Sequence, residues 1–318
     1  DVVRIADPKY PYWKEAGAHG GRSSIAMRQA SGLGPAMQAL LSENKYVMTE
    51  EPEEVKLQRV DRRTGRIDPD PQATNDDFFK DNFGANYDDL LDVVTFCTQT
   101  SINSDQLASL LSIERYAPHI SPNVSSPPMA DAKTFGSVFI NAEGNADAIS
   151  VSQPSGAVTD RKLINATKRH FDLINRMLRL ARHIDLPYDE CDLLLVAAGR
   201  AQARKSANEP VAKELATQSY KITDSTLRAI GLFQDFRREF RCTAEDFAAL
   251  IDEMSVCARG EEQSQFDRVF NGQSLFDTPL RLDGGKFAIH PQTDSDRRTV
   301  DQICSGLGIN LETWRYLA

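Results

Sequence analysis

The chain has 318 residues, of which 41% are hydrophobic and 26% charged, and it carries a formal net charge of −9 at pH 7. This composition is typical of a globular protein and not of a disordered one, and the length exceeds one typical domain. The acidic balance argues against nucleic acid as a partner, because phosphate binding needs a surplus of Lys and Arg. The longest apolar run, Leu193 to Ala198, is too short for a membrane-spanning segment.

The reactive residue types form no catalytic or metal-binding pattern. The five cysteines are scattered and include no Cys-x-x-Cys pair, which predicts buried free thiols. The five histidines include no pair at metal-ligand spacing, and no Gly-x-Ser-x-Gly elbow is present. We therefore expect no enzyme activity, no cofactor and no metal site.

The beginning of the chain gives the weakest structural signal. Residues 1–60 are predicted to form a loop-rich segment with short helices, one from Arg22 to Ala30 and one starting at Pro35. The first residue is Asp1 and no secretory signal follows it, so we expect a piece of a longer protein. Residues 61–130 are predicted to be a helical segment. Residues Glu50 to Pro71 are rich in charge and proline, which predicts a linker or a surface excursion.

From residue 86 onward, five predicted helices start in the same way. A capping residue or proline opens each helix, an acidic side chain usually follows two residues later, and apolar residues come four and seven residues after the opening one. The uneven spacing of these starts argues against a regular solenoid. The pattern predicts a mainly α fold, an irregular multi-helix bundle of capped helix pairs. The five opening residues are Asn86, Asn103, Pro187, Thr243 and Asn310.

Two short segments interrupt the helical pattern. Residues 131–160 are predicted to be a β-hairpin insertion, with strands at Thr134–Ile140 and Ile149–Val151 around a Gly-Asn turn. A second hairpin is predicted at Arg281–Ile289, where Asp-Gly-Gly supplies the turn. Residues 161–318 otherwise form one predicted helical segment, with these small hairpins as insertions.

The clearest single element is a long amphipathic helix predicted from Arg161, followed by a break at Pro187 and a second helix. Its apolar stripe runs from Ile164 through Phe171 to Ala181 at helical spacing. The opposite side is polar, and His170 and His183 are predicted to lie there. This side is either a solvated helix face or a contact for an anionic partner. The candidate partner-contact residues are Lys168, Arg169, Arg176, Arg179 and Arg182.

Several stretches together resemble one protein family. They occur in the family's order, and the likeness covers roughly residues 30–318, most specifically 141–195. The family is that of the A components of bacterial insecticidal toxin complexes, with the related Salmonella virulence plasmid A proteins. The stretches that carry the resemblance are Tyr87–Leu91, Tyr116–Val124, Gly136–Asn141, Phe171–Leu193 and Phe266–Asn271.

The resemblance implies a role in a large secreted assembly. Family members form homopentamers in which an α-helical shell surrounds a translocation channel, and sister subunits supply the toxic enzyme. This chain is similar to part of the helical shell only. The resemblance therefore implies a structural segment of a pore-forming toxin subunit, secreted or on the bacterial surface and acting at the host cell membrane. Its expected partners are further copies of itself and sister toxin subunits.

Two alternatives remain at this point. The first is a binding module that recognises a host cell surface or a partner subunit through the basic side of the long helix. The second is an independent helical enzyme, which the absence of catalytic motifs disfavours.

Overall fold

The computed structural model describes residues 32–33, 57–60, 67–70, 75–141, 147–154, 156–157, 160–206, 222–272, 276–282 and 290–317. The two predicted helices before residue 42 lie outside these ranges. So do residues 283–289 of the second predicted hairpin, although Leu282 forms a parallel bridge with Val124.

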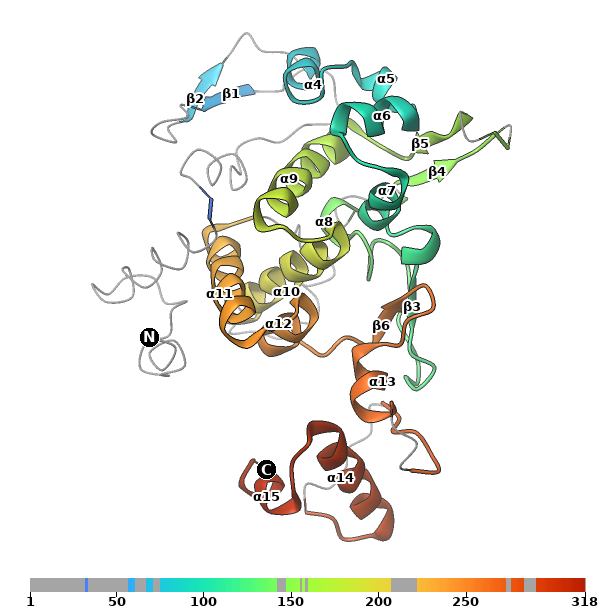
Figure 1. Ribbon diagram of the computed structural model, residues 1–318, viewed down its shortest axis with the longest axis vertical. Helices are drawn as coiled ribbons and strands as arrows, with labels where there is room; N and C mark the ends of the chain where they lie inside the picture. Colours follow the sequence, from blue (N-terminus) through green and yellow to red (C-terminus); the bar gives the residue numbers. More distant parts are fainter. Residues whose placement is uncertain are drawn as a thin grey trace, which may run out of the picture.

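The fold is mainly α, as the sequence predicts (Figure 1). The helices are α4 (Asn75–Phe83), α5 (Tyr87–Leu90), α6 (Val93–Thr100), α7 (Ser104–Leu111), η1 (Glu114–Tyr116), α8 (Val138–Asn141), α9 (Lys168–Ile184), α10 (Tyr188–Ser206), α11 (Asp224–Phe240), α12 (Ala244–Ile251), α13 (Gln265–Phe270), α14 (Asp294–Leu307) and α15 (Leu311–Leu317). The strands are β1 (Leu57–Val60), β2 (Ile67–Asp70), β3 (Pro118–Ile120), β4 (Ser150–Ser152), β5 (Lys162–Ile164) and β6 (Cys257–Arg259).

Strand pairing in the described ranges is limited to small antiparallel pairs. β1 pairs with β2, so the charged stretch predicted as a linker contains a hairpin. β3 pairs with β6 across a long sequence separation, and β4 pairs with β5. In Figure 1, β1–β2 and β4–β5 lie at the edge of the helical body, whereas β3–β6 lies between that body and α13.

The predicted helix starts are confirmed. α5, α7, α10, α12 and α15 each begin directly after one of the five opening residues. At α7 the Asn103 side chain accepts the Gln106 N–H at 2.8 Å, and the Gln106 side chain accepts the Asn103 N–H at 3.0 Å. Thr243 and Asp246 form the same reciprocal capping box at α12. These contacts satisfy backbone donors that the first turn of a helix otherwise leaves without partners.

The hairpin predicted within residues 131–160 is wrong. Val138 begins the buried helix α8, and β4 pairs with β5 instead of with residues 134–140. The reason is a distant carboxylate: Asp192 of α10 accepts the N–H groups of Val138 at 3.1 Å and Phe139 at 2.8 Å. This partner satisfies the start of a helix that local β propensity disfavours. The domain boundaries proposed at residues 60, 130 and 160 stay predictions.

The long helix starts later than predicted. Ile164 belongs to β5, is 41% exposed, and does not extend the apolar stripe of α9, which begins at Lys168. The chain reverses at Asp185, which has a left-handed conformation (φ 53°), and α10 follows after Pro187. The predicted pair of helices separated by a break is thus confirmed, with a shorter first helix.

Phe171 lies at the centre of the larger core. It is fully buried, and its ring lies 5.6–6.0 Å, centroid to centroid, from four aromatic rings of α4, α5 and α6. Three of these pairs are close to perpendicular, an arrangement that aromatic rings favour. The cluster therefore joins the beginning of the described helical region to α9. The four partner rings are Phe79, Phe83, Tyr87 and Phe96.

Candidate partner-contact site

The five candidate contact residues all lie on α9, but the structure does not place them on one solvated face. Arg182 is exposed, whereas the other four are half-buried. The polar side of α9 faces α4, α5 and α6 over part of its length. Its charged groups therefore divide into those that hold these helices together and those that remain accessible.

Arg176 pairs with a buried acid on its own helix. Its Nε lies 3.0 Å from Oδ2 of Asp172, and the two side chains are only 12% and 11% exposed. Burial raises the pKa of Asp172, and the charge of Arg176 acts in the opposite direction. Arg176 thus compensates a charge that the fold has removed from water.

Arg179 connects α9 to α4. It donates to Oδ1 of Asn82 at 2.7 Å through Nη2 and to Oδ1 of Asn175 at 3.1 Å through Nε. Asn175 also donates to the same Asn82 oxygen at 3.1 Å. Sequence reasoning missed Asn82, because 97 residues separate it from Arg179 and no local pattern marks it.

Lys168 and Arg182 lie at the two ends of α9, and of these only Arg182 is exposed. At the start, Nζ of Lys168 lies 5.6 Å from the centroid of the Tyr87 ring, a cation–π contact, and Arg169 follows it. In the last turn, Arg182 donates to the backbone carbonyl of Thr100, the last residue of α6. A partner that approaches this side would therefore meet the exposed Arg182 rather than Arg176.

The prediction for the two histidines of α9 is half wrong. His183 is exposed, whereas His170 is buried, with 5% of its surface accessible. His170 lies in the first turn, where its ring contacts the capping residue Thr167. The helical spacing of polar residues places His170 beside Lys168 and Arg169. This spacing cannot show that Thr167, which precedes the helix, contacts the His170 ring.

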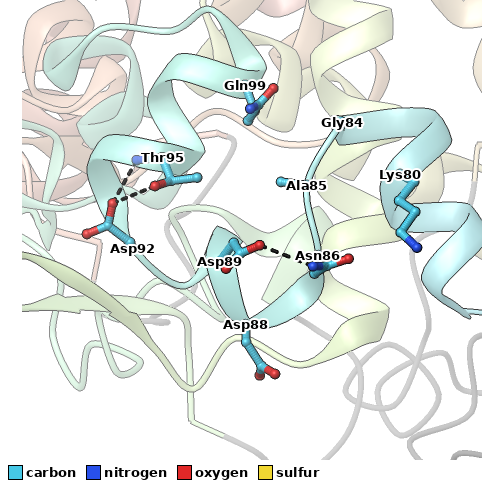
Figure 2. A pocket seen from close by; sticks show the side chains of 9 residues that line it. All are labelled: Lys80, Gly84, Ala85, Asn86, Asp88, Asp89, Asp92, Thr95 and Gln99. Atoms are coloured by element: carbon cyan, nitrogen blue, oxygen red, sulfur yellow. Dashed lines mark hydrogen bonds between the residues drawn. The ribbon is translucent and has the colours of Figure 1, made fainter.

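An open polar groove of about 610 Å³ is lined by residues of α4, α5, α6 and the turns between them (Figure 2). Asp89 turns toward Asn86 and accepts a hydrogen bond of 3.3 Å from Nδ2 of Asn86 to Oδ2 of Asp89. Asp92 caps α6 by accepting the N–H of Thr95. Its lining suits a cationic or hydrogen-bonding group better than an apolar one. The lining residues are Lys80, Gly84, Ala85, Asn86, Asp88, Asp89, Asp92, Thr95 and Gln99.

The start of α10 carries a second group of acids, with structural contacts. Asp189 accepts Nη1 of Arg259 at 2.8 Å and the hydroxyl of Ser109 at 2.7 Å, which joins α10 to β6 and α7. Asp192 is buried and holds α8 by accepting the N–H groups of Val138 and Phe139. Burial raises the pKa of Asp192 to about 7, although these N–H groups act in the opposite direction. The contacts of Asp189 and Asp192 join helices and a strand to one another, and they do not place a nucleophile beside a base.

Two further observations apply only to the described part of the chain. It contains no group of three or more His, Cys, Asp or Glu side chains placed to hold a metal ion. Every helix within these ranges also lacks either the length or the apolar character that a bilayer crossing requires.

Comparison with known proteins links the chain to one toxin component. It is similar to a protein named toxin subunit YenA1, from Yersinia entomophaga, with 32% identity over 261 residues. The match covers 78% of this chain and 21% of the relative, so the chain spans about a fifth of the length of that protein. No family model matches the chain, and no solved structure matches it.

Proposed function

Because this chain belongs to the A-type subunits of bacterial toxin complexes, we propose that it forms part of the α-helical shell of a pore-forming, toxin-translocating subunit. The observation that carries the proposal is the match to a toxin subunit over 78% of the chain. In this role the chain supports the structure and assembly of the subunit and does not catalyse a reaction.

The contacts between helices support a structural role. Arg179 joins α9 to α4, Asp189 joins α10 to β6 and α7, and Asp192 joins α10 to α8. Buried polar groups of this kind are costly when unpaired and rigidify a fold when paired. Such side chains suit a wall segment that keeps its shape while other parts of an assembly act.

In this proposal the parent protein is secreted or held on the bacterial surface and acts at the host cell membrane. Its partners are further copies of itself in a homopentamer and sister toxin subunits. Mass photometry of the full-length parent beside this 318-residue chain tests the assembly. We expect a pentamer for the parent and a smaller species for the chain, and a monomeric parent would contradict the proposal.

A second candidate function is partner binding through the end of α9 that carries Arg182. The observation that favours it is the exposure of Arg182, in contrast to the half-buried Arg176 and Arg179, which are engaged within the fold. Charge reversal of Arg176 or Arg179 would damage the fold, so these residues cannot test binding separately.

Arg182→Glu is the more informative change for this candidate because Arg182 is exposed, and urea unfolding of the variant checks that losing the bond to the Thr100 carbonyl leaves the fold intact. We expect it to weaken capture of a sister subunit at low salt and to have less effect at high salt, because exposed charges are screened by ions. Arg238→Glu is the matched control, since the Arg238 side chain is 72% exposed and belongs to α11. Capture is measured by surface plasmon resonance at two salt concentrations. Equal capture by the wild type and Arg182→Glu would contradict this candidate.

A further inference from the structure

The start of α9 uses a histidine where capping boxes usually have Glu or Gln. The N–H of Thr167 donates to Nδ1 of His170 at 2.9 Å, and the N–H of His170 lies 3.4 Å from Oγ1 of Thr167. A ring nitrogen accepts an N–H only when it carries no proton. The geometry therefore requires a neutral imidazole, with Nδ1 as the acceptor.

We infer that the start of α9 is an acid-sensitive joint, which the neutral ring of His170 holds closed. Protonation of Nδ1 would turn the acceptor into a donor and leave it facing the Thr167 N–H. The half-buried Thr167 N–H would then lose its partner, which is unfavourable. This inference concerns the fold of the chain and does not depend on the proposed function.

The surroundings of His170 oppose its protonation. The ring is buried, and the charged groups that act on it are both cations, Arg169 on the same helix and Lys133 on the segment before α8. A hydrogen bond with the Asn165 backbone favours the charged form, but burial and the two cations outweigh it and lower the pKa of His170 to about 4. The neutral form is thus built into the folded state.

The joint connects elements on both sides of it. On one side the hydroxyl of Tyr87 donates at 2.7 Å to the carbonyl of Ala166, two residues after the end of β5. On the other side Phe171, the next residue after His170, fills the centre of the aromatic cluster. Opening of this turn would therefore loosen the attachment of α5 and β5 to α9.

The sign of the pH effect follows from proton binding. An unfolded chain protonates histidine near pH 6.5, whereas folded His170 does so near 4. Between these values the unfolded state binds more protons, so this group lowers stability as the pH falls. Full linkage to one proton changes the unfolding constant about tenfold per pH unit.

His170→Gln tests the inference, because Gln keeps a carbonyl acceptor for the Thr167 N–H and does not titrate. Urea unfolding is followed between pH 7.5 and 4.5. We expect the wild type to lose stability relative to His170→Gln by up to about tenfold in the unfolding constant per pH unit below 6.5. His183→Gln, at an exposed position on the same helix, should follow the wild type. Parallel profiles for the wild type and His170→Gln would overturn the inference.

A second measurement decides the question if His170→Gln does not fold. The histidine Cε1–Hε1 signals of the folded wild type are followed by NMR as the pH is lowered. The His170 signal should keep the chemical shift of a neutral ring as the pH is lowered from 7.5 to about 5. A His170 ring that titrates near 6.5 in the folded protein would show that the cap does not require neutrality.

Discussion

At the scale of single residues, the polar side chains of α9 differ in what they contribute. Arg176 and Asp172 are an ion pair largely removed from solvent, whereas Arg238 and Asp235 are a pair in which the arginine is 72% exposed. Removing one partner of a buried pair leaves an uncompensated charge, and removing one partner of an exposed pair changes little. The same residue type therefore has different consequences in α9 and α11.

Arg176→Leu should lower the free energy of unfolding by on the order of 3 kcal/mol, because it leaves Asp172 buried without this partner. Arg238→Leu should change it by less than about 0.5 kcal/mol. Urea denaturation at neutral pH measures both. The double variant Asp172→Leu/Arg176→Leu should recover part of the loss. A double variant that loses the full sum of the two single effects would contradict this account.

Asp192 titrates in the sense opposite to His170. Its folded pKa, raised by burial to about 7, exceeds that of an unfolded aspartate, so it lowers stability as the pH rises from about 4 to 7. The pH profile of the wild type is therefore a sum of opposing contributions. For this reason the effect of His170 is read from the difference between two variants and not from one curve.

At the scale of elements, the contact between α13 and α14 depends on a glycine, Gly306, which has no side chain. A Cβ at Gly306 would lie 2.5 Å from Cδ1 of Phe270 and 2.7 Å from the carbonyl oxygen of Val269. Gly308, two residues later, ends α14 with φ +64° and has no atom within 4 Å of such a Cβ. One glycine allows close packing and the other allows a left-handed turn.

Gly306→Ala should separate α14 from α13, because its new methyl group meets backbone and ring atoms. Gly308→Ala should cost about 1 kcal/mol through backbone strain alone and leave the packing intact. Hydrogen–deuterium exchange over residues 290–317 distinguishes the two effects. Faster exchange throughout α14 is expected for Gly306→Ala only. Equal exchange in both variants would show that the close approach has little energetic weight.

Element boundaries were predictable where the decisive contacts are local. The capping residues Asn103 and Thr243 act within three residues along the chain, so a single sequence reveals them. α8 was not predictable in this way, because the acceptor for its first N–H groups is Asp192, more than 50 residues away. Local β propensity favoured a strand, and a tertiary contact favoured the helix.

At the scale of the whole molecule, the mainly α class followed from periodicity and helix caps, and the toxin-subunit family followed from several short stretches. The candidate site was predictable only in part. The sequence shows that Arg176 and Arg179 lie on the polar side of α9, but only the structure shows that Asp172 and Asn82 engage them. Asp172 lies only four residues from Arg176 on the same helix, but Asn82 lies 97 residues from Arg179, and a single sequence does not reveal such a distant contact.

The aromatic cluster has a consequence for synthesis of the protein on the ribosome. Four of its rings come from residues 79–96, and the central ring is Phe171. A nascent chain therefore carries the complete α4 to α6, which end at Thr100, for 71 residues before Phe171, the residue that completes their core, is translated. During that interval their apolar faces lack this partner, and a chaperone that shields phenylalanine-rich segments would act at this stage.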